Sequence, residues 1–291
     1  MELESLRQQL APTVAATEAH ELLTGLPEGP SDWRALATAL ALRHREAAYP
    51  AGWVLGISGG QGAGKSTLTA LIVEAFQGAG LRAVCLGLDD FYLTRAERQA
   101  LALSVHPLLK TRGVPGTHDV DLAVDVLDAL RRGDTVEAPV FDKASDDRLA
   151  EPRTISGGAD LIIFEGWCVG AGPQPGALLE AAGNALEEDE DADGRWRRAI
   201  NDALAGPYAA LFSRLDELLF LAVPGIEAVL RWRTEQEQQH PPAQRMNAEA
   251  LSRFVAHYER LTRWMLATLP QTADIVGVLD ETHALAALKR P

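Results

Sequence analysis

The chain has 291 residues, of which 47% are hydrophobic, and its 27 basic and 41 acidic side chains give a formal net charge of −14. This length suits one large or two small domains, and the hydrophobic content is typical of a globular protein with a buried core. The negative charge argues against nucleic acid or an anionic membrane as the main partner. An anionic nucleotide would have to be drawn by a local cluster of positive charge.

Cysteine content and the absence of targeting signals bear on the compartment. The two cysteines, Cys85 and Cys168, lie in apolar runs, which favours reduced thiols over a disulfide framework. The first residues show no basic region followed by an apolar one, and no apolar run reaches the roughly 20 residues needed to cross a membrane. We therefore expect a cytoplasmic protein with no membrane partner; the oligomeric state is left open.

Two helices are expected at the start of the chain, over residues 2–24 and 31–48. The glycines and prolines between 25 and 30 separate them. This pair carries no residues that suggest chemistry. We expect residues 1–50 to form a helical extension packed on a second unit, residues 51–291.

The second unit begins with a glycine-rich motif. The apolar run 53–57 predicts a buried strand, and apolar side chains recur at helical spacing after Lys65. Between them, Gly59, Gly64, Lys65 and Ser66 match the pattern G-x-x-x-x-G-K-[ST]. Glycines allow backbone N–H groups to point inward around an anion, and the following helix contributes free N–H groups and the positive end of its dipole. The alternative, a glycine-rich turn without a ligand, is disfavoured by these flanks.

This motif predicts a phosphate-binding loop. Lys65 would reach the β- and γ-phosphates of a nucleotide, and the Ser66 hydroxyl would hold Mg²⁺. The predicted nucleotide contacts in the loop are Gly59, Gly60, Gln61, Gly62, Ala63, Gly64, Lys65, Ser66 and Thr67.

Strands and helices alternate along the rest of the chain. Further strands are expected over 82–88, 136–141, 159–164, 217–223 and 273–279, and helices after Thr94, Asp119 and Gly225 and over 247–269. This alternation predicts an α/β fold with a mainly parallel sheet covered by helices on both faces. The acidic stretch 183–194, flanked by glycines, is expected to be a solvated, mobile insertion.

Carboxylates follow two of the expected strands. Asp89 and Asp90 follow the second strand, and Glu165 follows Leu-Ile-Ile-Phe. Ligands of parallel sheets collect at the carboxyl ends of the strands, so these groups should lie near the phosphate loop. Asp89 or Asp90 could accept a proton from an alcohol, and Glu165 could bind Mg²⁺ or its waters. The alternatives are a helix N-cap pair or a turn for the aspartates and a solvated strand end for the glutamate.

Two groups of basic residues complete the candidate site. Arg231 and Arg233 begin a polar helix and could fold over the nucleotide, unless they form a solvated face. Lys143 and Arg148 could bind a small acidic substrate, unless they form surface ion pairs.

Several stretches together resemble the D-glycerate 3-kinases, a family of phosphate-loop kinases related to uridine, phosphoribulose and pantothenate kinases. They are 56–67, 88–94 (Leu-Asp-Asp-Phe-Tyr-Leu-Thr), 112–119 (Arg-Gly-Val-Pro-Gly-Thr-His-Asp), 141–143 (Phe-Asp-Lys) and 165–167 (Glu-Gly-Trp), followed by 232–237 and 254–258. The resemblance implies a three-layer αβα P-loop NTPase fold, ATP and Mg²⁺ as donor and cofactor, and Asp89 as catalytic base with Lys65 as the phosphate-directed cation. It further implies that Arg112, Thr117, His118, Asp119 and Lys143 help enclose the acceptor, and we also expect Asp90, Tyr92 and Arg148 to contact it.

The favoured hypothesis is therefore an ATP-dependent kinase of a small hydroxy acid, with D-glycerate to 3-phosphoglycerate as the implied reaction. A second hypothesis keeps ATP and replaces the acceptor with a nucleoside or a pantothenate-like alcohol. A third is a regulatory protein that hydrolyses a nucleotide as a switch. The absence of the guanine-specificity sequence Asn-Lys-x-Asp and the position of Asp89 disfavour the third.

Overall fold

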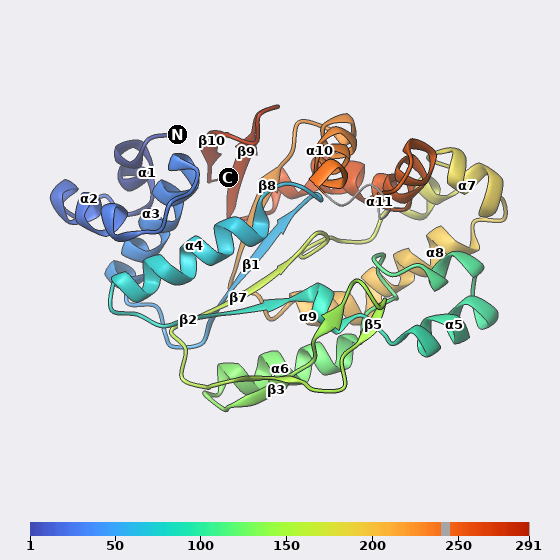
Figure 1. Ribbon diagram of the computed structural model, residues 1–291, viewed down its shortest axis with the longest axis horizontal. Helices are drawn as coiled ribbons and strands as arrows, with labels where there is room; N and C mark the ends of the chain where they lie inside the picture. Colours follow the sequence, from blue (N-terminus) through green and yellow to red (C-terminus); the bar gives the residue numbers. More distant parts are fainter. Residues whose placement is uncertain (240–244, 291) are drawn as a thin grey trace.

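The computed structural model describes residues 1–239 and 245–290. Its centre is a six-stranded sheet with the order β10-β9-β8-β1-β7-β2 (Figure 1). The strands are β1 (Trp53–Gly59), β2 (Ala83–Gly87), β7 (Leu161–Gly166), β8 (Glu217–Ala222), β9 (Ile275–Leu279) and β10 (Leu285–Lys289). All pair in parallel except β10, which is antiparallel to β9. The prediction of a mainly parallel sheet is confirmed, with one edge strand, β10, that was not predicted.

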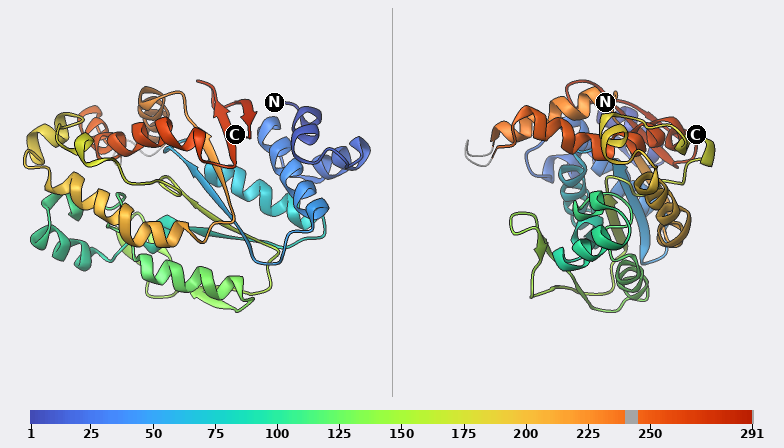
Figure 2. Two further views of the ribbon diagram at one scale, coloured as in Figure 1. Left: turned by 180° about the vertical axis from the view of Figure 1, so that it is seen from behind. Right: turned by 90° about the vertical axis from the view of Figure 1, so that its right-hand side faces the viewer.

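Helices cover both faces of this sheet (Figures 1 and 2). Side chains alternate along β7: Leu161 and Ile163 face one core cluster, and Ile162 and Phe164 face the other. The first cluster includes α1 (Leu3–Leu10), α3 (Ser31–Ala47), α4 (Lys65–Gly78) and α10 (Ile226–Gln239). The second includes α6 (Val120–Arg131), α9 (Ala209–Phe212) and most of the buried face of α11 (Ala248–Thr268), which leads into the turn η6 (Leu269–Gln271). The result is the expected three-layer αβα arrangement.

The N-terminal residues form three helices rather than two. The expected helix over 2–24 is divided into α1 and α2 (Ala16–Gly25), because Pro12 cannot continue a helix and disfavours helical geometry at the residue before it. The three helices lie together beside α4 and the C-terminal hairpin, in blue in Figure 1. A buried ion pair joins α3 to the sheet, with Arg43 Nη1 2.7 Å from Glu217 Oε1.

Polar caps begin two helices where the sequence predicts them. Thr94 and Glu97 form a capping box at α5 (Arg95–Ser104), and Asp119 accepts a hydrogen bond from the Leu122 N–H at the start of α6. Short 3₁₀ turns, η1 (Leu88–Phe91) and η2 (Pro107–Lys110), connect these elements to β2 and to the segment after α5.

The expected strand over 136–141 is divided between two small sheets. β3 (Val136–Ala138) pairs with β6 (Arg153–Ile155), and β4 (Phe141–Asp142) pairs with β5 (Asp147–Arg148). Pro139 follows β3 and has no N–H to continue its ladder. The β4–β5 hairpin carries Lys143 to the end of β2, where it contacts Asp89.

The acidic stretch between β7 and β8 is ordered. The chain there forms η3 (Gly176–Leu179), α7 (Ala185–Glu190), α8 (Arg195–Ala203) and the π-helical turn η4 (Leu204–Tyr208). Four of the six acidic side chains in the stretch are exposed as expected: Glu188, Asp189, Glu190 and Asp193. The expectation of a solvated insertion over 183–194 is wrong for Glu187 and Asp191, which have no exposed surface. Arg260 and Arg197 pair with these carboxylates and permit their burial.

Among the helices in the described ranges, none has the length and apolar character needed to span a bilayer.

Candidate active site

The loop between β1 and α4 has the geometry of a phosphate cradle. Gly62 and Gly64 both have φ of +82°, a region that favours glycine, and a Cβ on Gly62 would lie 3.0 Å from the Trp232 Cβ. No side chain caps the N-terminus of α4, so its first N–H groups are available to an anion. Lys65 Nζ donates to the carbonyls of Gly59 at 2.9 Å and Gly60 at 3.2 Å, which places the ammonium across the loop.

Two strands bring carboxylates to the edge of the sheet beside this loop. β2 pairs with β7 so that Gly87 is opposite Glu165, and η1 then places Asp89 and Asp90 directly after β2. A Cβ on Gly87 would lie 3.6 Å from Asp90 Oδ2 and 3.8 Å from Glu165 Oε1. The Asp90 and Glu165 carboxylates therefore converge over Gly87.

Asp89 is held by two donors. The Tyr92 hydroxyl donates to Oδ1 at 2.8 Å, and Lys143 Nζ donates to Oδ2 at 2.6 Å. Burial tends to raise the pKa of Asp89, but the charge of Lys143 and these two hydrogen bonds outweigh it, so the pKa lies below its usual value. Asp89 is therefore ionised at neutral pH.

The neighbouring titratable groups respond differently. Burial raises the pKa of Asp90, although Arg153 lies 3.7 Å away. Burial also raises the pKa of Glu165, although Lys65 opposes the shift. Burial lowers the pKa of Lys65, an effect that Glu165 and Asp89 oppose. Asp89 and Asp90, adjacent in sequence, thus have pKa values shifted in opposite directions.

A cavity of about 1120 Å³ connects these groups. This volume exceeds that of a typical small-molecule pocket, so it has room for a nucleotide and a small second substrate. It is lined by Gln61, Gly62, Lys65, Ser66, Gly87, Asp89, Asp90, Tyr92, Arg95, Arg98, Gln99, Lys110, Thr111, Arg112, Phe141, Lys143, Asp146, Glu165, Gly166, Trp167, Arg233, Gln236, Met246, Phe254 and Tyr258.

Many of the residues predicted from the sequence line this cavity. They are Gln61, Gly62, Lys65, Ser66, Asp89, Asp90, Tyr92, Arg112, Lys143, Glu165 and Arg233. Gly59, Gly60, Ala63, Gly64 and Thr67 belong to the same loop and the first turn of α4 but do not line it.

Three predicted acceptor residues, Thr117, His118 and Asp119, lie behind the cavity wall instead. Thr117 is fully buried and its hydroxyl donates to the Val114 carbonyl at 2.7 Å. The His118 ring stacks on Tyr92 at 4.5 Å and bonds to the Tyr208 hydroxyl, and burial lowers its pKa to about 4. These residues support the end of β2 and are not cavity-lining groups.

Arg148 and Arg231 are also directed elsewhere. Arg148 Nε donates to the Tyr92 carbonyl at 2.6 Å, and its guanidinium pairs with Asp119. Arg231 pairs with Glu281 in the turn before β10. Of the two arginines expected to fold over the nucleotide, Arg233 lines the cavity, where it also bonds to Gln236 and Glu237.

The prediction missed the basic end of the cavity, which α5 and the segment after it form. Arg95, Arg98 and Lys110 belong to this end. One sequence signal could have indicated Lys110: the chain has four lysines, and three of them, Lys65, Lys110 and Lys143, line this cavity.

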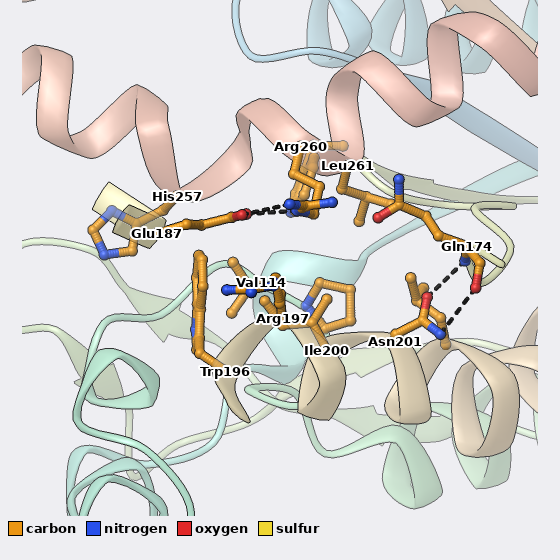
Figure 3. Close-up of a pocket in the computed structure, with 13 residues that line it drawn as sticks. Val114, Gln174, Glu187, Trp196, Arg197, Ile200, Asn201, His257, Arg260 and Leu261 are labelled. Atoms are coloured by element: carbon orange, nitrogen blue, oxygen red, sulfur yellow. Dashed lines mark hydrogen bonds and ion pairs between the residues drawn. The ribbon is translucent and has the colours of Figure 1, made fainter. Parts of the chain in front are cut away.

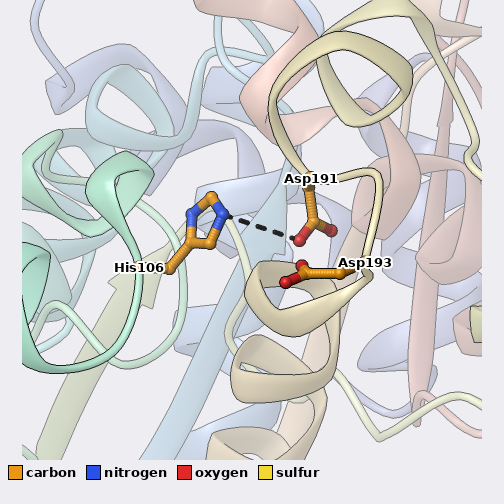
Figure 4. Close-up of side chains that lie close together, drawn as sticks. All are labelled: His106, Asp191 and Asp193. Atoms are coloured by element: carbon orange, nitrogen blue, oxygen red, sulfur yellow. Dashed lines mark ion pairs between the residues drawn. The ribbon is translucent and has the colours of Figure 1, made fainter.

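A second cluster of potential metal ligands, His106, Asp191 and Asp193, lies among residues that do not line the cavity (Figure 4). His106 Nδ1 accepts from the Leu108 N–H at 3.3 Å, so in the neutral ring Nε2 carries the proton and faces Asp191 as a donor. Asp191 Oδ1 already accepts from the Trp196 N–H at 2.7 Å. A metal-bound histidine instead donates from its other nitrogen, so this donor set does not fit a metal ion.

The parallel sheet, the glycine-rich loop after its central strand and the carboxylates at two neighbouring strand ends define a P-loop kinase fold. The sequence model of the Phosphoribulokinase / Uridine kinase family matches residues 54–170. The uncharacterized kinase mug58 of Schizosaccharomyces pombe is 34% identical over 263 residues, which cover 79% of this chain and 89% of that protein. The chain therefore belongs to this family of P-loop kinases.

Other relatives include proteins with a stated substrate. The chloroplastic D-glycerate 3-kinase of Arabidopsis thaliana is 30% identical over 232 residues, which cover 74% of this chain but only 48% of that protein. Among solved structures, the YGR205w protein has a TM-score of 0.67 at 25% identity, covering 84% of this chain and 91% of that one. A D-glycerate 3-kinase from Cryptococcus neoformans has a TM-score of 0.71 at 23% identity, covering 95% and 100%, which supports the fold.

Proposed function

We propose that this kinase transfers the γ-phosphoryl group of ATP to a hydroxyl of a small hydroxy acid, with D-glycerate to 3-phosphoglycerate as the reaction. The observation that carries the proposal is the position of Asp89, held by Tyr92 and Lys143, in one cavity with the phosphate loop and the basic end. The likeness to the Arabidopsis D-glycerate 3-kinase favours glycerate as acceptor.

The loop residues would bind the donor phosphates. Lys65 would exchange its bonds to the Gly59 and Gly60 carbonyls for the β- and γ-phosphate oxygens. The donor set of Ser66, on the first turn of α4, and Glu165 fits Mg²⁺, which prefers oxygen ligands, and the convergence of Asp90 with Glu165 adds a second carboxylate nearby. Bound Mg²⁺ would neutralise charge on the β- and γ-phosphates.

Asp89 would orient the acceptor hydroxyl and take its proton. A carboxylate with a lowered pKa is a weak base toward an alcohol in the ground state. In a loose phosphoryl-transfer transition state the proton leaves late, so positioning of the hydroxyl matters more than basicity. The bonds from Tyr92 and Lys143 fix the carboxylate for this role.

The basic end would bind the acceptor carboxylate. Arg112 Nη1 pairs with Asp146, and its guanidinium lies 5.4 Å from the Phe141 ring centroid. The Lys110 carbonyl accepts from Arg98 Nη1, but no hydrogen-bond or ion-pair partner of its ammonium lies among the described residues, so the ammonium can meet an anion. A neutral acceptor would leave the Lys110 ammonium without an anion to pair with.

A substrate panel tests the proposal. Purified protein with Mg²⁺ and ATP is assayed for ADP release with D-glycerate, L-glycerate, uridine, pantothenate and no acceptor. We expect ADP release to depend on D-glycerate, with 3-phosphoglycerate as product. Turnover with uridine or pantothenate alone would overturn the glycerate assignment, and ADP release that no acceptor increases would favour a nucleotide-hydrolysing switch.

A further inference from the structure

The acidic segment between β7 and β8, here residues 183–194, contains two carboxylates that are costly to bury. Glu187 and Asp191 have no exposed surface, although four other acidic residues lie in the same segment. Burying an ion pair is no more stabilising than burying apolar groups of similar size. A role in placing other parts of the molecule would explain these two carboxylates better than stability does.

Glu187 fixes α7 to α11. Its Oε1 accepts from Arg260 Nε at 2.7 Å, and its Oε2 accepts from Arg260 Nη2 at 2.6 Å and from the Gly183 N–H at 2.7 Å. Figure 3 shows this pair beside Trp196 and Arg197 from α8, around a space of about 20 Å³ that has room for little more than one water molecule. The contact sets the position of α11 along the acidic segment.

Asp191 fixes the start of α8 and faces the segment that follows α5. It accepts from the Trp196 N–H at 2.7 Å and the Arg197 N–H at 3.2 Å, and Arg197 Nη1 lies 2.9 Å from Oδ2. Its Oδ1 lies 3.8 Å from His106 Nε2 (Figure 4). His106 in turn caps η2.

The segment 106–114 therefore has one side on this buried network. Trp196 packs in an apolar cluster with Leu108, Leu109, Val114 and Leu186. α11 holds the end of the segment, because the Tyr258 hydroxyl donates to the Arg112 carbonyl at 3.2 Å. Gly113 cannot be replaced there without displacement, since a Cβ would lie 2.1 Å from the Tyr258 hydroxyl oxygen.

The other side of the same segment faces the cavity. Lys110, Thr111 and Arg112 line its basic end, whereas neither Glu187 nor Asp191 does. We propose that the acidic segment positions residues 106–114, so that Glu187 and Asp191 determine affinity for the acceptor without touching it. The proposal depends on the proposed function in one respect, which is that the basic end of the cavity binds the acceptor.

The test uses Asp191→Asn and Glu187→Gln, with Asp189→Asn as the matched control. Asp189 is an exposed carboxylate on α7 within the same segment. For the acceptor that the wild-type protein turns over, we expect each of the two buried changes to raise the acceptor KM about tenfold to a hundredfold, with the ATP KM nearly unchanged. The control should change neither. Equal effects on both KM values, or no effect on either, would overturn the proposal.

Amide hydrogen exchange gives a readout that needs no acceptor. In Asp191→Asn the amides of residues 108–112 should exchange about tenfold faster or more, while those of residues 54–68 keep the wild-type rate. If this variant does not fold, the double change Asp191→Asn with Arg197→Gln removes both buried charges and should show the same local effect. Unchanged exchange at residues 108–112 in a folded variant would overturn the proposal, whereas a wild-type protein inactive on D-glycerate would overturn only the proposed acceptor.

Discussion

Lys143 and Asp89 form an ion pair that joins the β4–β5 hairpin to the end of β2, with Nζ 2.6 Å from Oδ2. The lysine is largely exposed, with 63% of its side chain accessible, whereas Asp89 is 36% accessible. An exposed cation on a hairpin thus helps to lower the pKa of a less accessible carboxylate. An acceptor hydroxyl that reaches Asp89 must share it with this ammonium.

Removing the ammonium should move the acid limb of the pH profile. Lys143→Met leaves burial to raise the pKa of Asp89, so activity that needs the ionised carboxylate should be lost at a higher pH than in the wild type. The profile of log kcat/KM, measured from pH 9 down to about pH 3 so that it includes the ordinary aspartate range, measures this shift. Lys289→Met, a lysine on β10 outside the cavity lining, is the control and should leave the profile unchanged. An acid limb that stays in place or moves to lower pH in Lys143→Met would contradict the coupling.

Loss of the loop lysine should lower turnover strongly while the fold persists. Lys65→Ala should lower kcat/KM for ATP by about 10²-fold or more, because a cation directed at the transferred phosphate is lost. Ser66→Ala should raise the Mg²⁺ concentration needed for half-maximal rate. Both side chains lie outside the two apolar core clusters, so circular dichroism melting should stay near that of the wild type. Near-normal turnover in Lys65→Ala would exclude the phosphate-loop role.

Two arginines from the predicted acceptor pocket should behave differently. Arg112→Ala removes a cavity-lining cation and should raise the acceptor KM more than the ATP KM. Arg148→Ala removes bonds to the Tyr92 and Phe91 carbonyls and should lower kcat and the melting temperature together, because the end of β2 is loosened. Steady-state kinetics and thermal melts of both variants make the comparison. A selective rise in acceptor KM in Arg148→Ala would place that residue in contact with substrate.

Two buried histidines should make the fold acid-sensitive. Burial lowers the pKa of His44 and of His118 to about 4, well below the value of about 6.5 in an unfolded chain. Between these values the unfolded state binds more protons, so the free energy of unfolding should fall as the pH falls, by about 2 kcal/mol for each histidine at pH 5. Urea unfolding from pH 7 to 5 measures this. Stability that is constant or rises toward pH 5 would contradict the burial of neutral imidazoles.

The sequence predicts the chemistry of the site better than the side-chain directions around it. The glycine-rich motif predicts a strand before it and a helix after it. Because β1 and β2 both pair in parallel with β7, Asp89 and Glu165 lie at the same edge of the sheet as the loop. Thr117, His118 and Arg148 are close in sequence to residues that line the cavity. Their side chains point elsewhere because tertiary packing brings them to other partners, which are Val114, Tyr208 and Asp119.

Two other errors of the sequence-based predictions concern the acidic segment 183–194 and the short strand β10. The acidic sequence around Glu187 predicts a solvated side chain. Its partner Arg260 is 73 residues away in the sequence, so the pairing that permits burial cannot be predicted from the local pattern. β10 was missed because Leu-Ala-Ala-Leu-Lys contains no β-branched or aromatic residue, and its pairing with β9 is what makes it a strand.

The central claim is that Asp89 is the carboxylate that activates the acceptor hydroxyl. The most direct measurement is kcat of Asp89→Asn and Asp90→Asn side by side, with ATP affinity measured for each. We predict that Asp89→Asn lowers kcat by roughly 10²–10⁴-fold with ATP affinity little changed, and that Asp90→Asn loses far less. A crippled Asp90→Asn beside an active Asp89→Asn, or two variants with nearly wild-type kcat, would contradict the account.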